Sequence, residues 1–193
     1  MSTHEGPDDE LWVIRHGETE WSRDGRHTSH TELELTPEGE DVVARRLADR
    51  LDGVEFDLVL TSPRVRARRT AELAGFTDAH LEDDLTEWDY GDYEGLTTAT
   101  IRETVPGWTV WSQRCPGGET GEQVSQRMDR VVGKVRAHGG RVLVFSHGHA
   151  SRALAARWLG QPVEEGRLFS LDTATISVLA YERESPTVAR WNS

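Results

Sequence analysis

The stretch LWVIRHGETEW, residues 11–21, determines both the fold class and the place where chemistry is expected. Its first residues, Leu11 to Ile14, are bulky and apolar, which is typical of a buried strand. Arg15 and His16 follow at once, although charged and polar side chains avoid buried positions unless they have a partner or a function. The stretch therefore predicts a core strand that ends at a functional site.

A second stretch, RVLVFSHGHA over residues 141–150, repeats this arrangement. Residues 141–145 form the clearest buried strand of the chain, and Ser146, His147 and Gly148 follow it directly. Ligands of open α/β sheets bind outside the carboxyl ends of the strands. Two His-Gly turns are therefore expected to face one pocket if the two strands are neighbours. The glycines suit a tight turn or a close approach of the backbone to a ligand.

Helical segments alternate with the strands. Thr36 and Pro37 are typical of a helix start, and Ser62 with Pro63 repeats the pattern after a strand at 56–60. The other expected elements are a strand at 81–86, a short helix at 98–105, a helix at 120–138 begun by a Thr120/Gln123 capping box, a helix at 150–159, and strands at 176–181 and 188–191. This order predicts an α/β fold, a three-layer α/β/α sandwich with a mainly parallel central sheet.

Length and composition indicate one domain and exclude several functions. With 193 residues, the chain suits a single domain at 10–193 behind a disordered tail at 1–9, and the weaker pattern at 89–118 predicts a small lid-like insertion. The net charge of −12 argues against a nucleic-acid or membrane partner. Cys115 is the only cysteine, so no intrachain disulfide can form. Without a signal-like or bilayer-length apolar run, we expect a cytoplasmic protein.

Four arginines gather in TSPRVRARRTA, residues 61–71: Arg64, Arg66, Arg68 and Arg69. Arg64 and Arg68, four residues apart, share one helix face, and Arg66 points away from them. An arginine near the free N–H groups of a helix start is a natural element of a phosphate site, whereas a solvated face is the alternative.

Together, these motifs resemble the histidine phosphatase superfamily, which includes phosphoglycerate mutases and many phosphatases. RHGE (residues 15–18), TSPRVRARRTA and FSHGH (residues 145–149) carry the resemblance, which covers about residues 11–159. TEWDYGDYEGL (residues 86–96) and CPGGET (residues 115–120) resemble a narrower branch of small bacterial acid phosphatases and sugar-bisphosphate phosphatases.

The resemblance implies a metal-independent phosphatase that hydrolyses small phosphomonoesters, sugar phosphates among them, through a phosphohistidine. His16 would be the nucleophile, and Glu87 would protonate the leaving oxygen and then activate water. The phosphoryl oxygens would be held by Arg15, Arg66 and His147, with Ser22, Thr28 and Gly148 as further substrate-binding residues. Ser22 stands where the mutases usually carry asparagine. No cofactor and no metal are implied, and the partner would be a small phosphorylated metabolite.

Physical chemistry agrees with these roles. Phosphoryl transfer needs charge stabilisation and in-line positioning, which two guanidiniums supply. His16 must be neutral and held in one tautomer, whereas His147 would serve best as a protonated donor. Glu87 needs burial or a substrate anion to hold the proton that it donates. We therefore expect an acidic or near-neutral pH optimum.

Three other functions are open. A cofactor-dependent phosphoglycerate mutase needs extra basic residues, but between Tyr90 and Val132 the chain offers only Arg102, Arg114, Arg127 and Arg130. Fast isomerisation of 3-phosphoglycerate without phosphate release would indicate that function. A metal hydrolase could use the His147-x-His149 spacing, which full activity in EDTA would exclude. A non-catalytic phosphate-binding module is the third.

Some residues have two readings at this stage. Aromatic residues of the insertion could pack its base or line a sugar pocket: Trp88, Tyr90, Tyr93, Trp108 and Trp111. His27 and His30 are expected to be exposed loop residues, and contact with the substrate is the alternative. A homodimer is the commonest oligomeric state and is the expectation where the sequence is silent.

Overall fold

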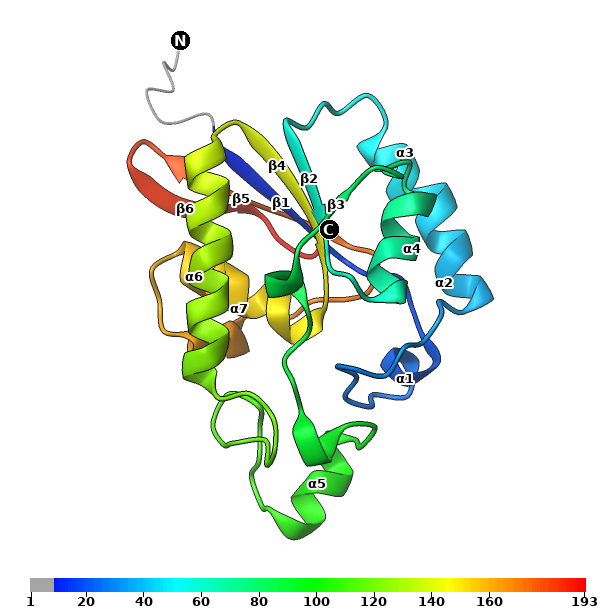
Figure 1. Ribbon diagram of the computed structural model, residues 1–193, viewed down its shortest axis with the longest axis vertical. Helices are drawn as coiled ribbons and strands as arrows, with labels where there is room; N and C mark the ends of the chain where they lie inside the picture. The colour runs from blue at the N-terminus through cyan, green and yellow to red at the C-terminus, as the bar shows by residue number, and fades with distance from the viewer. Residues whose placement is uncertain (1–8) are drawn as a thin grey trace.

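The computed structural model describes residues 9–193, and within them one six-stranded sheet forms the centre of the molecule (Figure 1). The strand order is β3-β2-β4-β1-β5-β6. The strands are β1 (Glu10–Arg15), β2 (Leu58–Thr61), β3 (His80–Leu81), β4 (Arg141–Ser146), β5 (Ile176–Glu182) and β6 (Ser185–Arg190). Neighbours among β1 to β4 pair in parallel, whereas β5 pairs antiparallel with β1 and β6. The predicted mainly parallel sheet is confirmed.

Helices cover both faces of this sheet, as the three-layer prediction requires (Figure 1). One layer holds α2 (Pro37–Val42), the π-helical turn η1 (Val43–Leu47), α3 (Ala48–Leu51) and α4 (Val65–Leu73). The other layer holds α6 (Gly121–His138) and α7 (Gly148–Trp158). Successive residues of a strand point to opposite faces, so Val144 packs with the α6–α7 side and Phe145 with the other. Apolar runs without alternation are the result.

The register of the two central strands places the two His-Gly turns together. β1 and β4 are parallel neighbours, and Arg15 pairs with Ser146 at their carboxyl ends. His16 and His147 therefore leave the sheet side by side. The backbone N–H of His16 donates to the Ser146 carbonyl at 3.0 Å, which extends the pairing into the turn.

Several predicted boundaries were wrong. The strand expected at 188–191 begins earlier, at Ser185, and the helix expected at 150–159 begins at Gly148. Two further differences have a clear physical reason. Helix α4 begins at Val65 with Arg64 as its N-cap, not at Ser62 and Pro63. The reason is tertiary, because the Ser62 backbone N–H pairs with Phe145 and its hydroxyl contacts a histidine described below. The predicted strand at 81–86 is also shorter, since β3 ends at Leu81 and a 3-10 turn, η2 (Asp83–Leu85), follows.

The insertion at 89–118 contains the 3-10 turn η3 (Gly91–Tyr93) and α5 (Thr98–Thr104). Figure 1 shows α5 at the end of the molecule away from the amino-terminal ends of β1 and β4. Its tryptophans, Trp108 and Trp111, are buried with Trp88 in the α6–α7 core, so they pack the base of the insertion. A lid function of this segment stays a prediction.

The ends of the chain complete the description. The predicted tail at 1–9 lies outside the described residues except for Asp9, whose carboxylate accepts the Gly140 N–H at 2.9 Å. Short elements fill the remaining loops: α1 (Glu20–Arg23) and the 3-10 helix η4 (Val163–Leu168). No helix of residues 9–193 has both the length and the apolar character that crossing a membrane demands.

Candidate active site

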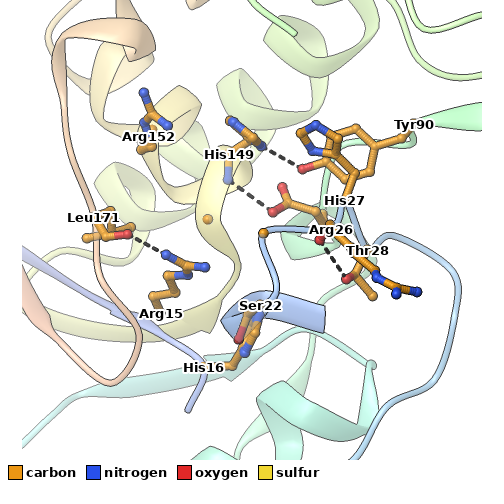
Figure 2. Close-up of a pocket in the computed structure, with 13 residues that line it drawn as sticks. Arg15, His16, Ser22, Arg26, His27, Thr28, Tyr90, His149, Arg152 and Leu171 are labelled. Atoms are coloured by element: carbon orange, nitrogen blue, oxygen red, sulfur yellow. Dashed lines mark hydrogen bonds between the residues drawn. The ribbon is translucent and has the colours of Figure 1, made fainter. Parts of the chain in front are cut away.

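A pocket of about 170 Å³ opens at the carboxyl ends of β1 and β4 (Figure 2). Most of the sequence-predicted site residues line it: Arg15, His16, Ser22, Thr28, Glu87 and Gly148. The other lining residues are Gly25, Arg26, His27, Tyr90, His149, Arg152 and Leu171. Arg66 and His147, the remaining predicted residues, lie directly behind this surface and are 0% exposed.

His16 is held in one tautomer. Its Nδ1 lies 2.7 Å from the carbonyl oxygen of Gly17, which can only accept, so Nδ1 carries the proton and Nε2 keeps its lone pair. Burial, and then the charges of Arg66 and Arg15, lower the pKa of His16 well below its ordinary value. A lowered pKa keeps the imidazole neutral into the acidic range. His16 thus has the form that a nitrogen nucleophile requires.

The turn after His16 is fixed by a buried threonine. The backbone N–H of Gly17 donates to Oγ1 of Thr70 at 2.9 Å, and that hydroxyl donates to the Arg66 carbonyl at 2.7 Å. One hydroxyl therefore connects the His16 turn to the helix that carries Arg66. A side chain at Gly17 would not fit, since a Cβ there would lie 2.9 Å from Val43. This glycine is required by close packing.

Arg66 and His147 form a buried pair behind His16. The guanidinium Nε of Arg66 donates to Nδ1 of His147 at 3.1 Å, and the other imidazole nitrogen lies 2.8 Å from Oγ of Ser62. The remaining Arg66 nitrogens donate to the carbonyls of Thr28, Ser29 and Thr31, at 3.2 Å each. The rings of His16 and His147 meet edge to face, with centroids 5.2 Å apart.

These contacts correct the expectation that His147 is protonated. Nδ1 of His147 accepts from a guanidinium, so in this structure the ring is neutral and its proton is on Nε2. Burial, followed by the charges of Arg66 and a protonated His16, lowers the pKa of His147 well below its ordinary value. His147 is therefore a neutral ring whose N–H donates to Oγ of Ser62.

Arg15 lies on the pocket wall beside Gly148. Its Nη1 donates to the carbonyl of Leu171, and its buried Nε has no hydrogen-bond partner within residues 9–193. Burial lowers the pKa of Arg15, and the Glu87 charge partly offsets this effect. A Cβ added at Gly148 would lie 3.5 Å from both the Arg15 guanidinium and the Glu87 carboxylate. Glycine at this position keeps the space between the two groups open, and the unpaired Nε can serve an anion.

Glu87 is buried at the start of α7, where free backbone donors point at it. One carboxylate oxygen accepts the N–H groups of Trp88 and Ala150 at 2.8 Å each, and the other accepts that of His149 at 3.0 Å. The N-terminal end of a helix favours an anion in this position. The carboxylate is therefore held in a fixed orientation at the pocket surface.

Ser22 and Thr28 line the pocket as expected, but local structure holds them. Oγ of Ser22 takes part in the capping box of α1, accepting from the N–H of Thr19 at 2.9 Å and donating to its carbonyl at 3.0 Å. Oγ1 of Thr28 donates to the Arg26 carbonyl at 3.3 Å. The loop around Thr28 is tied to the insertion, where the Glu94 carboxylate accepts the N–H groups of Ser29 and Thr31.

The side of the pocket away from His16 was predicted only in part. His27 was expected to be exposed, but it is 9% exposed and packs against Tyr90 and Trp108. His30 is exposed, as expected, and contacts Arg64 and Asp89. The Tyr90 hydroxyl lies 2.6 Å from Nδ1 of His149.

Arg152 was not predicted on this side of the pocket, whereas Tyr90 was one of the aromatic residues considered for a pocket wall. Arg152 follows His149 on α7 and lies over the ring of Trp111, 4.8 Å from its centroid. Of the aromatic residues in the insertion, Tyr90 reaches the pocket lining. Within the described part of the chain, no group of three or more His, Cys, Asp or Glu side chains could hold a metal ion.

Comparison with known proteins agrees with this geometry. Residues 11–193 match the model of the histidine phosphatase superfamily, branch 1. The chain is 47% identical to an acid phosphatase of Mycobacterium tuberculosis over 177 residues, 89% of this chain and 86% of the relative. It is 37% identical to a sedoheptulose 1,7-bisphosphatase of Saccharomyces cerevisiae over 185 residues, 79% of this chain and 68% of the relative. A solved structure from Mycobacterium tuberculosis matches with a TM-score of 0.90 at 44% identity, covering 95% of this chain and 97% of that one.

Proposed function

The chain belongs to the histidine phosphatase superfamily, and from this premise we propose that it is a metal-independent phosphatase of small phosphomonoesters that works through a phosphohistidine. One observation carries the mechanism: the Gly17 carbonyl holds Nδ1 of His16, which leaves Nε2 as the free nucleophilic nitrogen beside Arg15 and Arg66. Sugar phosphates fit the polar lining of the pocket.

The reaction has two displacements on phosphorus. In the first, Nε2 of His16 attacks, the bond from phosphorus to the ester oxygen breaks, and Glu87 gives its proton to the leaving alcohol. In the second, Glu87 takes a proton from water, the hydroxide attacks phosphorus, and the bond to nitrogen breaks to release inorganic phosphate. Arg15 and Arg66 stabilise the charge on the phosphoryl oxygens in both steps, and the N–H of His147 joins them once it leaves Oγ of Ser62 for a phosphoryl oxygen.

The protonation of Glu87 follows from the substrate. The Glu87 carboxylate accepts hydrogen bonds from three backbone N–H groups in this structure. A phosphoryl dianion bound next to the carboxylate favours the protonated acid, because two like charges in one buried site repel. Because its lowered pKa keeps His16 neutral into the acidic range, we propose an acidic to near-neutral pH optimum for the enzyme.

A phosphoglycerate mutase is the second candidate, and the pocket gives it less support. Such an enzyme would use basic residues of the insertion and α6 on a second phosphate, but Arg102, Arg114, Arg127 and Arg130 all lie outside the pocket lining. Arg127 is bound to Glu119, and Arg130 is bound to Asp84. Carboxylates of the protein itself therefore balance the charges of Arg127 and Arg130.

Trapping the intermediate tests the proposed function. The enzyme is mixed with a ³²P-labelled phosphomonoester and quenched in base, where a phosphohistidine survives and a phosphoserine does not. We expect label on the peptide that contains His16, none in His16→Asn, and equal release of alcohol and phosphate in EDTA. Loss of activity in EDTA, label elsewhere, or transfer of the phosphoryl group to 3-phosphoglycerate without phosphate release would contradict the proposal.

The setting of the enzyme is part of the proposal. We propose a cytoplasmic enzyme whose partner is a small phosphorylated metabolite, without nucleic acid or membrane, and which associates as a homodimer. The net charge of −12 supports the exclusion of nucleic acid and anionic membranes. Fractionation of the source cells and light scattering of the purified protein test the location and the oligomeric state.

A further inference from the structure

Backbone carbonyls of one loop orient the buried guanidinium of Arg66. Within residues 9–193 its hydrogen-bond acceptors are Nδ1 of His147 and three carbonyls of this loop, those of Thr28, Ser29 and Thr31. All four acceptors are neutral, so they direct the guanidinium without cancelling the charge that a phosphoryl group needs. The orientation of Arg66 is therefore only as fixed as the loop that supplies the carbonyls.

Glu94 of the insertion holds the same loop, residues 28–31, from the other side. Its carboxylate accepts the backbone N–H of Ser29 at 2.9 and 2.8 Å, the Ser29 hydroxyl at 2.5 Å and the backbone N–H of Thr31 at 3.0 Å. Burial alone would raise the pKa of Glu94, but the hydrogen bonds from Ser29 and Thr31 outweigh it, and the pKa is lowered. Glu94 is therefore an ionised acceptor, and hydrogen bonds to an ionised group are stronger than those between neutral groups.

One peptide unit connects the two sets of contacts. The carbonyl of Thr28 and the N–H of Ser29 belong to the same planar peptide group. That carbonyl accepts from Arg66, and that N–H donates to Glu94. Thr31 repeats the arrangement within one residue, since its N–H donates to Glu94 and its carbonyl accepts from Arg66. The position of the Glu94 carboxylate therefore sets the position of the Arg66 guanidinium.

The insertion also pairs with the chain just before this loop. Arg26 and Thr97 form an antiparallel bridge. The N–H of His27 donates to the Leu96 carbonyl at 2.9 Å, and the N–H of Gly95 donates to the His27 carbonyl at 2.8 Å. These contacts join main-chain groups, so they stay in place when the nearby carboxylate is replaced. Loss of the carboxylate should therefore loosen residues 28–31 without detaching the insertion.

We propose that Glu94 is a positioning residue for phosphoryl transfer: it fixes residues 28–31, whose carbonyls aim the Arg66 guanidinium at the phosphoryl group. The inference rests on the proposed function, because Arg66 acts there on the phosphoryl oxygens. Glu94 directly follows η3, a turn of the insertion. The insertion therefore has a part in the chemistry of the site, through a carboxylate that does not touch the substrate.

Inhibition by orthovanadate, together with substrate kinetics, tests the proposal. Vanadate adopts the five-coordinate geometry of a phosphoryl group in transfer, so its inhibition constant reports how well the groups around that geometry are placed. In Glu94→Gln, which loses the charged acceptor, we expect this constant to rise about tenfold and kcat/KM to fall equally for alkyl and aryl phosphates. Glu94→Asp keeps the charge and should keep part of the affinity. Ser29→Ala removes only the hydroxyl contact and should give a smaller change in the same direction, so it carries the test if Glu94→Gln does not fold.

The ¹H–¹⁵N signal of the Arg66 Nε group reports the positioning itself. This group donates to Nδ1 of His147 at 3.1 Å inside the protein, so its chemical shift and its hydrogen exchange depend on that contact. We expect Glu94→Gln to move the signal and to speed its exchange with solvent. A loss of stability alone would leave the signal of the folded protein where it is.

Glu10→Gln is the matched control. Glu10 is also a part-buried carboxylate and accepts the Trp12 indole N–H at 3.0 Å, but it lies at the start of β1, away from the pocket. Its replacement should change neither the vanadate constant nor the Arg66 signal, and thermal unfolding measures what each variant loses in stability. An unchanged vanadate constant or Arg66 signal in Glu94→Gln, or an equal change in Glu10→Gln, overturns the inference while the phosphatase function stands. Absence of phosphate release by the wild-type enzyme overturns the phosphatase function itself.

Discussion

The two ends of the pocket are built differently. At the phosphate end, His16, Arg66 and His147 are positioned by backbone carbonyls and by each other, directly beyond two central strands. At the distal end, side chains from separate segments meet, among them His27 from a loop and Arg152 from the second turn of α7. The difference teaches that the chemistry is fixed by the sheet, whereas the choice of substrate depends on how loops and helices pack over it.

The largest expected effect is at the phosphate end, in His16→Asn. The asparagine amide can still donate to the Gly17 carbonyl, but it has no nucleophilic lone pair. We expect kcat to fall by at least about 10³-fold for every phosphomonoester, whatever its leaving group. Steady-state assays over a set of alkyl and aryl phosphates measure this. If the loss varied strongly with the leaving group, His16 would act on the leaving group and not as the nucleophile.

The effect of Glu87→Gln should depend on the leaving group of the substrate. Glutamine keeps the shape and can accept the N–H groups of Trp88 and Ala150, but it cannot deliver a proton. We expect losses on the order of 10²–10⁴-fold for alkyl phosphates, whose alcohols need protonation, and a far smaller loss for p-nitrophenyl phosphate. Equal losses on both would contradict the role of Glu87 as the acid.

The distal end should also be visible in the stability of the protein toward acid. Burial lowers the pKa of His27 to about 4 from 6.5, and the charge of Glu94 only partly offsets this effect. Between these two values the unfolded chain binds more protons than the folded one. The contribution of His27 to the free energy of unfolding is therefore fully present above pH 6.5 and is lost as the pH falls through about 4. The upper limit of this loss is ~3 kcal/mol for one group.

The measurement compares urea unfolding at pH 4.5 and at pH 7.5. His27→Gln should flatten the pH dependence by about one proton. The pKa values of His16, His147 and His149 are lowered as well. The free energy of unfolding of the variant must therefore still depend on pH, with a smaller slope. An unchanged slope in His27→Gln would show that His27 is hydrated in solution.

How much of each end could be predicted follows from the range of the interactions. The strands at 11–14 and 141–145 were predictable because strands covered on both faces are continuous apolar runs. The N-cap at Ser62 was wrong because its hydroxyl contacts His147, which lies 85 residues further along the chain. His27 looked exposed among polar neighbours, and its burial comes from Tyr90 and Trp108.

The residues of the phosphate end could be predicted from short motifs, because they lie next to one another at the ends of strands and helices. The position of Arg152 in the sequence was enough to predict that it lies at the site. It stands one helical turn after Gly148, on the face of α7 that the HGH motif had already placed at the site. Among the described residues Arg152 has no carboxylate partner, and no local pattern could predict this. The surroundings of Arg152 depend on how η4 and the insertion pack around α7.

A smaller effect is expected where the phosphate end meets the helix of Arg66. Thr70→Val keeps the shape but leaves the Gly17 N–H buried without an acceptor. We expect kcat to fall by about tenfold with KM nearly unchanged, because the lost hydrogen bond positions His16 and does not touch the substrate. Thr70→Ser should restore most of the rate. Thr104→Val is the matched control, since the Thr104 hydroxyl contacts a carbonyl of its own helix.

The smallest effect should come from Tyr90→Phe, which tests how the distal end is organised. Phenylalanine fills the same space, but Nδ1 of His149 loses the hydroxyl that now fixes its tautomer. Part of the population should then carry the ring hydrogen on Nδ1, which removes the donor from the pocket, so we expect KM for a sugar phosphate to rise about threefold with kcat kept. The ¹⁵N chemical shifts of the His149 ring report the tautomer directly. If they do not change while KM rises, Tyr90 contacts the substrate itself, and the distal end recognises it through the phenol instead of the imidazole.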